Sequence, residues 1–176
     1  MFVLRPAHSH ELETAVAIDD DACRALADVD ERLAFDLPDD HPFFVAEAER
    51  WRASFDRGLA VFACDAEGTP VGLMVYDVID GRPYLEQVSV LRAWMRRGVG
   101  RALVERAIAW SEREGELWLT TYAEVPFNRP WYERLGFVVA RDDECPPIVR
   151  EALGDERASL PDADARVGMV YRHRSR

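Results

Sequence analysis

The chain of 176 residues contains no lysine, so its 22 basic residues are all arginines. A phosphate-binding loop of the Walker type requires lysine followed by serine or threonine, and the sequence therefore excludes that class of nucleotide site. No apolar run approaches the ~18 residues that cross a bilayer, and no charged-then-apolar leader opens the chain. We therefore expect a cytoplasmic protein with no membrane partner.

Cysteine and histidine are also scarce, with three and four copies. Cys23, Cys64 and Cys145 are odd in number, widely scattered and free of Cys-x-x-Cys spacing. This pattern favours buried or inert thiols in a reducing compartment over a disulfide framework. The histidines show no paired ligand spacing with acids or cysteines, so no metal site is expected.

The net charge of −11 disfavours nucleic acid as a partner, since phosphate backbones are bound by an excess of positive charge. Two interpretations of the acidic surface stay open, because it can keep the protein soluble or attract cationic amines. The 48% hydrophobic content is typical of globular proteins. At this length the sequence predicts a single domain spanning residues 1–176.

The stretch from Val90 to Leu103 carries the strongest functional signal. A β-rich run over 84–90 leads into it, and an amphipathic helical pattern over 99–114 leaves it. Four arginines and two glycines lie at the junction: Arg92, Arg96, Arg97, Arg101, Gly98 and Gly100. A helix start has N–H groups without intrahelical partners, and glycine admits a phosphate close to the backbone. A dinucleotide fingerprint would need a third glycine where Leu103 stands.

A second motif, Pro126-Phe-Asn-Arg-Pro-Trp-Tyr-Glu-Arg-Leu-Gly-Phe137, follows about thirty residues later. Pro130 suits the first turn of a short helix, and Gly136 suits the left-handed residue that closes one. Together the two motifs resemble motifs A and B of the GNAT superfamily of N-acetyltransferases, over roughly residues 59 to 142. Met95 departs from the pattern, since the family usually has Gln or Arg at that position.

Periodicity predicts the elements between the motifs. Strands are expected over 2–5, 59–64, 71–76, 84–90, 117–122, 137–140 and 166–173. Helices are expected over 10–28 (broken near the acidic residues 19–21), 43–57, 99–114, before Gly136, and from the residue after Pro146-Pro147 to Gly154. Hairpin turns are expected at 67–70 and 80–81. The resemblance implies an α+β fold with a mixed, mostly antiparallel central sheet, splayed between the fourth and fifth strands and flanked by helices.

The resemblance also implies acetyl-CoA as co-substrate, with no metal. Its pyrophosphate would lie on the arginine–glycine turn, and its pantetheine arm would pair with the backbone of Val88 and Val90. The turn residues implied are Arg96, Arg97, Gly98, Val99, Gly100 and Arg101. Asn128 has two interpretations: it contacts the cofactor, or it caps the short helix, because it lies nearer the tyrosine than the family asparagine does.

Two side chains are candidates for the chemistry. Tyr132 matches the family tyrosine that protonates the leaving thiolate, and packing in the core is its alternative. Glu86 is the candidate base, since alternation places it on one strand face with Tyr84 and Val88, and Gln87 on the other. A polar residue on a partly wet strand face is the alternative for Glu86.

The leading hypothesis is an N-acetyltransferase acting by direct attack of a primary amine. The competing hypothesis is a catalytically weak or inactive acyl-CoA-binding module that acts as a sensor or partner subunit. The acceptor, a small-molecule or peptide amine, would contact residues 21–42, the hairpin at Asp80 and residues 142–165, and the sequence does not identify it. The resemblance is also compatible with a homodimer.

Overall fold

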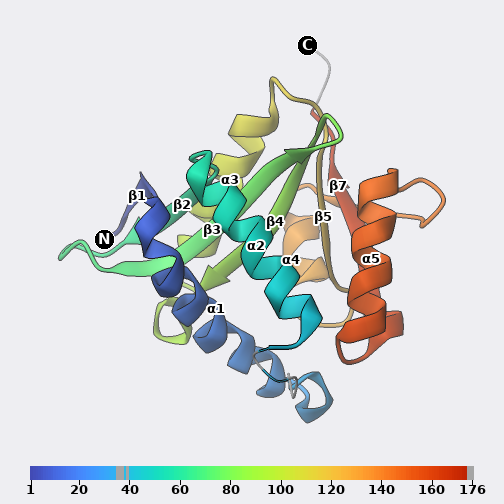
Figure 1. Cartoon of the computed structure of the whole chain (residues 1–176), viewed down its shortest axis with the longest axis horizontal. Coiled ribbons are helices and arrows are strands. Elements are labelled where there is room, and N and C mark those ends of the chain that lie inside the picture. The colour runs from blue at the N-terminus through green and yellow to red at the C-terminus, as the bar shows by residue number, and fades with distance from the viewer. Residues whose placement is uncertain (35–37, 39, 174–176) are drawn as a thin grey trace.

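The computed structural model describes residues 1–34, 38 and 40–173, which form a seven-stranded sheet in the order β1-β2-β3-β4-β5-β7-β6 (Figure 1). The strands are β1 (Val3–Pro6), β2 (Ala60–Cys64), β3 (Pro70–Ile79), β4 (Arg82–Val90), β5 (Leu117–Tyr122), β6 (Val138–Ala140) and β7 (Arg166–Tyr171). Neighbouring strands run antiparallel except β4 and β5, which are parallel. The predicted fold class, a mixed and mostly antiparallel sheet flanked by helices, is confirmed.

The sheet is covered by helices on both faces. Helices α1 (Leu12–Ala27), α2 (Pro42–Asp56) and α5 (Pro147–Ser159) lie in front of it in Figure 1, and α3 (Val99–Ser111) and α4 (Arg129–Arg134) lie behind. Strand β3 shows why both faces are apolar. Leu73 and Val75 pack with α1 and α2, whereas Met74 and Tyr76 pack with α3. Such two-sided burial is expected of a central strand.

Two helix predictions were wrong in detail. Helix α1 runs unbroken through residues 19–21, because tertiary contacts satisfy two of its three acids. Asp19 accepts hydrogen bonds from β4 side chains, and Asp21 accepts one from the backbone N–H of Arg92 at 2.8 Å. Helix α5 continues past Gly154 to Ser159, since Val149 and Leu153 bury its inner face. Of the predicted acceptor segment 21–42, residues 35–37 and 39 lie outside the described residues.

The parallel strands β4 and β5 separate almost at once. Tyr84 and Trp118 form their one registered pair, whereas β5 and its antiparallel neighbour β7 share six. Within the described part of the chain, residues 87–90 of β4 pair with β3 and with no other strand, and Glu86 is itself unpaired. The backbone groups on the other edge of this segment therefore have no strand beside them, as the predicted splay requires.

A β-bulge sits at the start of that open segment. Val75 pairs with Gln87 and the next residue, Tyr76, pairs with Leu85, so Glu86 is an extra residue in β4. A bulge changes which face the following side chains occupy. Glu86 and Gln87 both contact helices of the α1–α2 side, while Leu85 and Val88 pack on the α3 side. The prediction that Glu86 shares a face with Val88, opposite Gln87, was therefore wrong.

No helix among the described residues has the length and apolar character needed to span a bilayer. The same part of the chain holds no group of three or more His, Cys, Asp or Glu side chains arranged to bind a metal ion.

Candidate functional site

The turn between β4 and α3 presents a row of free backbone donors. Arg96 has φ of +60° and Gly98 has φ of +85°, which makes Gly98 a left-handed residue at the N-cap of α3. The first backbone bond of the helix runs from the N–H of Ala102 to the carbonyl of Gly98. Among the described residues, the backbone N–H groups of residues 96–101 find no protein acceptor. Alternating left-handed residues before a helix start form a concave anion site, and the helix dipole adds positive potential.

The arginines around this turn are differently engaged. Arg92 pairs with Asp21 at 3.3 Å, and Arg101 pairs with Glu105 at 3.2 Å. The guanidinium of Arg97 lies 5.1 Å from the ring centre of Trp94, a contact that leaves its N–H groups open. Arg96 is exposed and has no ion pair within the described part of the chain. Arg96 and Arg97 are therefore the side chains best placed to add charge to an anion at the amides.

Glycine allows the helix start to approach the sheet. A Cβ on Gly72 of β3 would lie 2.8 Å from Cγ1 of Val99, closer than real side chains come. A Cβ on Gly100 would lie 3.5 Å from the Trp131 ring and 3.6 Å from Val90. The anion turn, the open edge of β4 and helix α4 therefore meet at one place.

Tyr132 lies on α4 beside this meeting point. It is 9% exposed, and its ring packs edge-on against Trp131 and Phe137. Its hydroxyl has no hydrogen-bond partner among the described residues. Two fully buried side-chain atoms there also lack a partner, Trp51 Nε1 and Trp118 Nε1, and the Tyr132 hydroxyl is not as completely buried as these. Burial raises the pKa of the phenol above its ordinary value. Tyr132 is thus a protonated phenol in the core beside the anion turn, and none of the described residues accepts its hydroxyl proton.

Glu86 lies on the other face of the sheet, on the side of α1 and α2. Its side chain is 5% exposed and accepts a hydrogen bond from Arg50 Nε at 2.5 Å. Burial raises the pKa of this carboxyl, and the charge of Arg50 opposes the rise. The structure therefore places Glu86 and Tyr132 on opposite faces of the sheet, at the strand where it opens.

Asn128 occupies the N-cap position of α4, but its side chain makes no capping hydrogen bond. Its backbone carbonyl accepts instead, from the N–H groups of Trp131 and Tyr132 at 2.9 Å each. The capping interpretation of its side chain was wrong.

Sequence reasoning missed two polar residues near Glu86, Arg50 and Glu47, because their segment was read only as a helix. Asp19 was read as part of a helix break and as one of several acids that could attract an amine, and in the structure it is held against β4. Helical spacing alone put Glu47 and Arg50 on one face of α2. Nothing in the sequence indicated that this face would meet β4.

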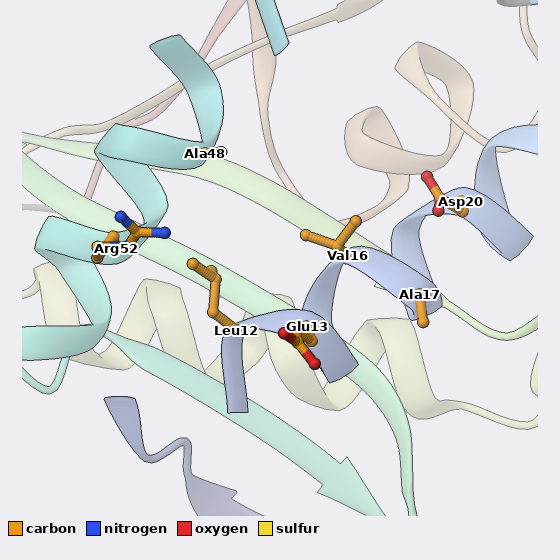
Figure 2. Close-up of a pocket in the computed structure, with 7 residues that line it drawn as sticks. All are labelled: Leu12, Glu13, Val16, Ala17, Asp20, Ala48 and Arg52. Atoms are coloured by element: carbon orange, nitrogen blue, oxygen red, sulfur yellow. The ribbon is translucent and has the colours of Figure 1, made fainter. Parts of the chain in front are cut away.

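A separate hollow of about 360 Å³ lies between α1 and α2 (Figure 2). Neither Asp19, Glu47 nor any residue of β4 contributes to it. It is an outer surface groove, lined by Leu12, Glu13, Val16, Ala17, Asp20, Ala48 and Arg52.

Comparison with known families agrees with this geometry. The model of the acetyltransferase (GNAT) family matches residues 21–137, a span that includes the amide turn, the open edge of β4 and Tyr132. The chain belongs to this family, and its membership supports acyltransferase activity.

Solved structures with the same fold span nearly the whole chain. The PaiA N-acetyltransferase of Thermoplasma acidophilum, solved with coenzyme A, has a TM-score of 0.68 at 12% identity, covering 98% of this chain and 99% of its own. The ribosomal-protein-S18-alanine N-acetyltransferase of Escherichia coli has a TM-score of 0.63 at 20% identity, covering 100% and 96%. The N-acetylglutamate synthase of Neisseria gonorrhoeae, solved with coenzyme A and N-acetyl-glutamate, has a TM-score of 0.66 at 17% identity, covering 99% and 36%. At these identities the likeness shows the fold alone.

Proposed function

We propose that this protein transfers the acetyl group of acetyl-CoA to a primary amine by direct attack. The observation that supports this most strongly is that the free amides of residues 96–101 adjoin the segment where, among the described residues, β4 and β5 separate. A diphosphate fits the amides, and an extended arm fits the edge of β4 that has no strand beside it.

The co-substrate contacts follow from that arrangement. The N–H groups of residues 96–101 bind the diphosphate, and the side chains of Arg96 and Arg97 add charge, with Arg101 following if it leaves Glu105. The backbone of Val88 and Val90 pairs with the pantetheine arm as a strand would. Asn128, whose side chain is not used in capping, is available as a polar contact at the start of α4.

The proposed chemistry uses one acid and one base. An alkylamine has a pKa near ~10.4 and is charged at neutral pH, so Glu86 takes its proton, directly or through water. The neutral nitrogen attacks the thioester carbon, and a backbone N–H of the β4 edge stabilises the oxyanion. As the carbon–sulfur bond breaks, Tyr132 donates its proton to the departing thiolate. The attacking nitrogen loses its second proton as it becomes an amide nitrogen, and this proton restores the tyrosine through water, while Glu86 releases its own proton to solvent. The products are an acetamide and free coenzyme A.

Acetyl-CoA is expected to raise the melting temperature, because a ligand that binds only the folded state stabilises it by mass action. ATP and NAD at equal concentration should give no comparable shift. A thiol-release assay over a panel of amines then measures turnover. Stabilisation by ATP or NAD alone would contradict the proposal.

The same two measurements separate the enzyme from a binding module. The ion pair that holds Glu86 against Arg50 favours the module, since a paired carboxylate is a weaker base. Stabilisation by acetyl-CoA without thiol release, for any amine of the panel, would support the module and remove the transferase.

Gly98→Ala is expected to raise the KM for acetyl-CoA about tenfold, roughly a 1.4 kcal/mol loss of binding. A methyl group would stand among the amides that bind the diphosphate. Gly68→Ala is the matched control, since Gly68 has φ of +87° against +85° for Gly98, and neither Cβ would meet protein. Equal KM values in the two variants would place the diphosphate elsewhere.

A further inference from the structure

A chain of side-chain hydrogen bonds crosses from β4 to α5 at the closed end of the splay, which is the registered pair of Tyr84 and Trp118. The hydroxyl of Tyr84 lies 3.1 Å from Oγ1 of Thr120 on β5. Thr120 donates its only hydroxyl proton to Glu156 of α5 at 2.6 Å, so Tyr84 is the donor in the first bond. The hydrogen bonds therefore run from Tyr84 to Thr120 and on to Glu156.

The carboxylate at the end of this chain is itself fixed. Arg166 of β7 pairs with one oxygen of Glu156 at 2.7 Å and donates a hydrogen bond to the other oxygen at 3.0 Å. The two side chains are 10% and 13% exposed, and the Arg166 guanidinium lies 4.6 Å from the ring centre of Tyr122. An ion pair with two contacts and little exposure has one preferred geometry. The hydroxyl of Thr120 is therefore held in place by α5 and β7.

Glu86 and Thr120 are the first residues past the closed end that face the layer of α1, α2 and α5. If the parallel pairing continued by two residues on each strand, Glu86 would lie opposite Thr120. Instead, Glu86 accepts from Arg50 of α2 at 2.5 Å, and Thr120 donates to the carboxylate on α5. The two strands are thus attached to different helices of one layer, just where their pairing stops (Figure 1).

Apolar packing already holds these elements together without the polar chain. Tyr84 and Trp118 share a buried cluster with Val149 and Leu153 of α5 and with Val170 of β7. Each hydroxyl or carboxylate buried beside this cluster gives up contacts with water, a cost that apolar side chains avoid. Hydrogen bonds are directional, whereas apolar burial is not. The polar chain therefore adds a fixed relative position of β4 and β5, which packing alone does not supply.

The path of acetyl-CoA in the proposed function brings its reacting end to this place. With the diphosphate on the amides of residues 96–101, the pantetheine arm follows β4 backwards past Val90 and Val88. The thioester then lies toward Glu86 and the closed end of the splay. Its carbon must meet the attacking nitrogen, an N–H donor and Tyr132 together, and a misplacement of about 1 Å can cost about 10²-fold in rate.

We propose that Tyr84, Thr120 and Glu156 are positioning residues for acetyl transfer. They set the separation of β4 and β5 at the closed end of the splay, and through it the position of the thioester. They act through the strands and not by contact with the reacting atoms. This inference rests on the transferase function proposed above.

Tyr84→Phe and Thr120→Val each remove one hydroxyl of the chain and should lower kcat about tenfold, measured by thiol release with the best amine of the panel. The Kd for free coenzyme A, measured by calorimetry, should change less than about twofold, because the diphosphate binds at the other end of the arm. The double variant should be no slower than the slower single variant, since both changes break the same hydrogen bond. Thr120→Ser keeps the hydroxyl and should keep a kcat near that of the parent.

Ser111→Ala is the matched control for the loss of a buried hydrogen bond. Ser111 is fully buried at the end of α3, and its hydroxyl donates to the carbonyl of Ile108 at 3.0 Å and lies 2.9 Å from Nε2 of His173. This variant should lower the melting temperature, as Tyr84→Phe does, but leave kcat unchanged. Losses of kcat that follow the losses of melting temperature in all variants, Ser111→Ala included, would overturn the inference.

Two other results would also overturn it: a parent kcat in Tyr84→Phe and Thr120→Val, or a Thr120→Ser variant as slow as Thr120→Val. Phenylalanine and valine preserve the shapes of the residues they replace, and an unchanged Kd for coenzyme A shows that a variant is folded. The failure modes differ as well. No stabilisation of the parent by acetyl-CoA would remove the transferase itself, whereas an active parent with unaffected variants would remove only the positioning role.

Discussion

Tyr132→Phe is expected to lower kcat by about two to three orders of magnitude, while the KM for acetyl-CoA changes little. A positioned general acid contributes roughly 10²–10⁴ to a rate, and the phenylalanine ring preserves the packing on Trp131 and Phe137. Steady-state thiol release at saturating amine measures the loss. Because burial raises the pKa of Tyr132, the parent should also keep its activity at pH values where an ordinary phenol of pKa ~10 begins to ionise.

Tyr76→Phe is the matched control. Tyr76 is buried against Trp110 of α3, and its hydroxyl has no hydrogen-bond partner among the described residues. The control should therefore lose neither activity nor a structural hydrogen bond. If Tyr132→Phe turns over at the parent rate, the leaving thiolate takes its proton from another group, and Tyr132 is a packing residue.

Glu86→Gln is expected to lower kcat/KM about a hundredfold at neutral pH, the scale of a lost general base. The base must be ionised, so the parent rate should fall as pH drops through the pKa of Glu86. Burial raises that pKa, which places the fall above the ordinary carboxyl range near ~4.3. In Glu86→Gln this decrease in rate at low pH should disappear, and the pH optimum should move to higher pH, where more of the amine is neutral.

The variant also leaves Arg50 without its partner, so Arg50→Gln is needed beside it. Removing the guanidinium removes a charge that lowers the pKa of Glu86. Arg50→Gln should stay active, and the decrease in its rate on the acidic side of the pH profile should occur at higher pH than in the parent. A pH profile for Glu86→Gln that matches the parent would assign the base to water or to another residue.

The parts of this site that sequence predicted are those built from local signals. The arginines and glycines of residues 92–101 lie together at the junction between β4 and α3, and the left-handed Gly136 follows the short helix that carries Tyr132, as expected. The splay of the sheet also agrees with the resemblance, because the two motifs border the strands that separate.

The parts that sequence missed depend on pairing between distant segments. The bulge at Glu86 comes from the register of β3 against β4, and a single extra residue reverses which helices a side chain meets. Asp19 interrupts no helix, because Gln87 and Ser89, nearly seventy residues away, hydrogen-bond its carboxylate. Helical periodicity carries no information about partners in distant segments, so the sequence pattern did not identify Glu47 and Arg50 as site residues.

Because Tyr84 and Trp118 form the single registered pair between β4 and β5, the sheet consists of two parts, one of β1 to β4 and one of β5, β7 and β6. Hydrogen bonding between them is concentrated near one end, and the far end relies on the packing of α3 across the join. A pantetheine chain bound between β4 and β5 would contact both parts of the sheet. The bound co-substrate would then replace some of the stabilising contacts that hydrogen bonds between neighbouring strands provide in a continuous sheet.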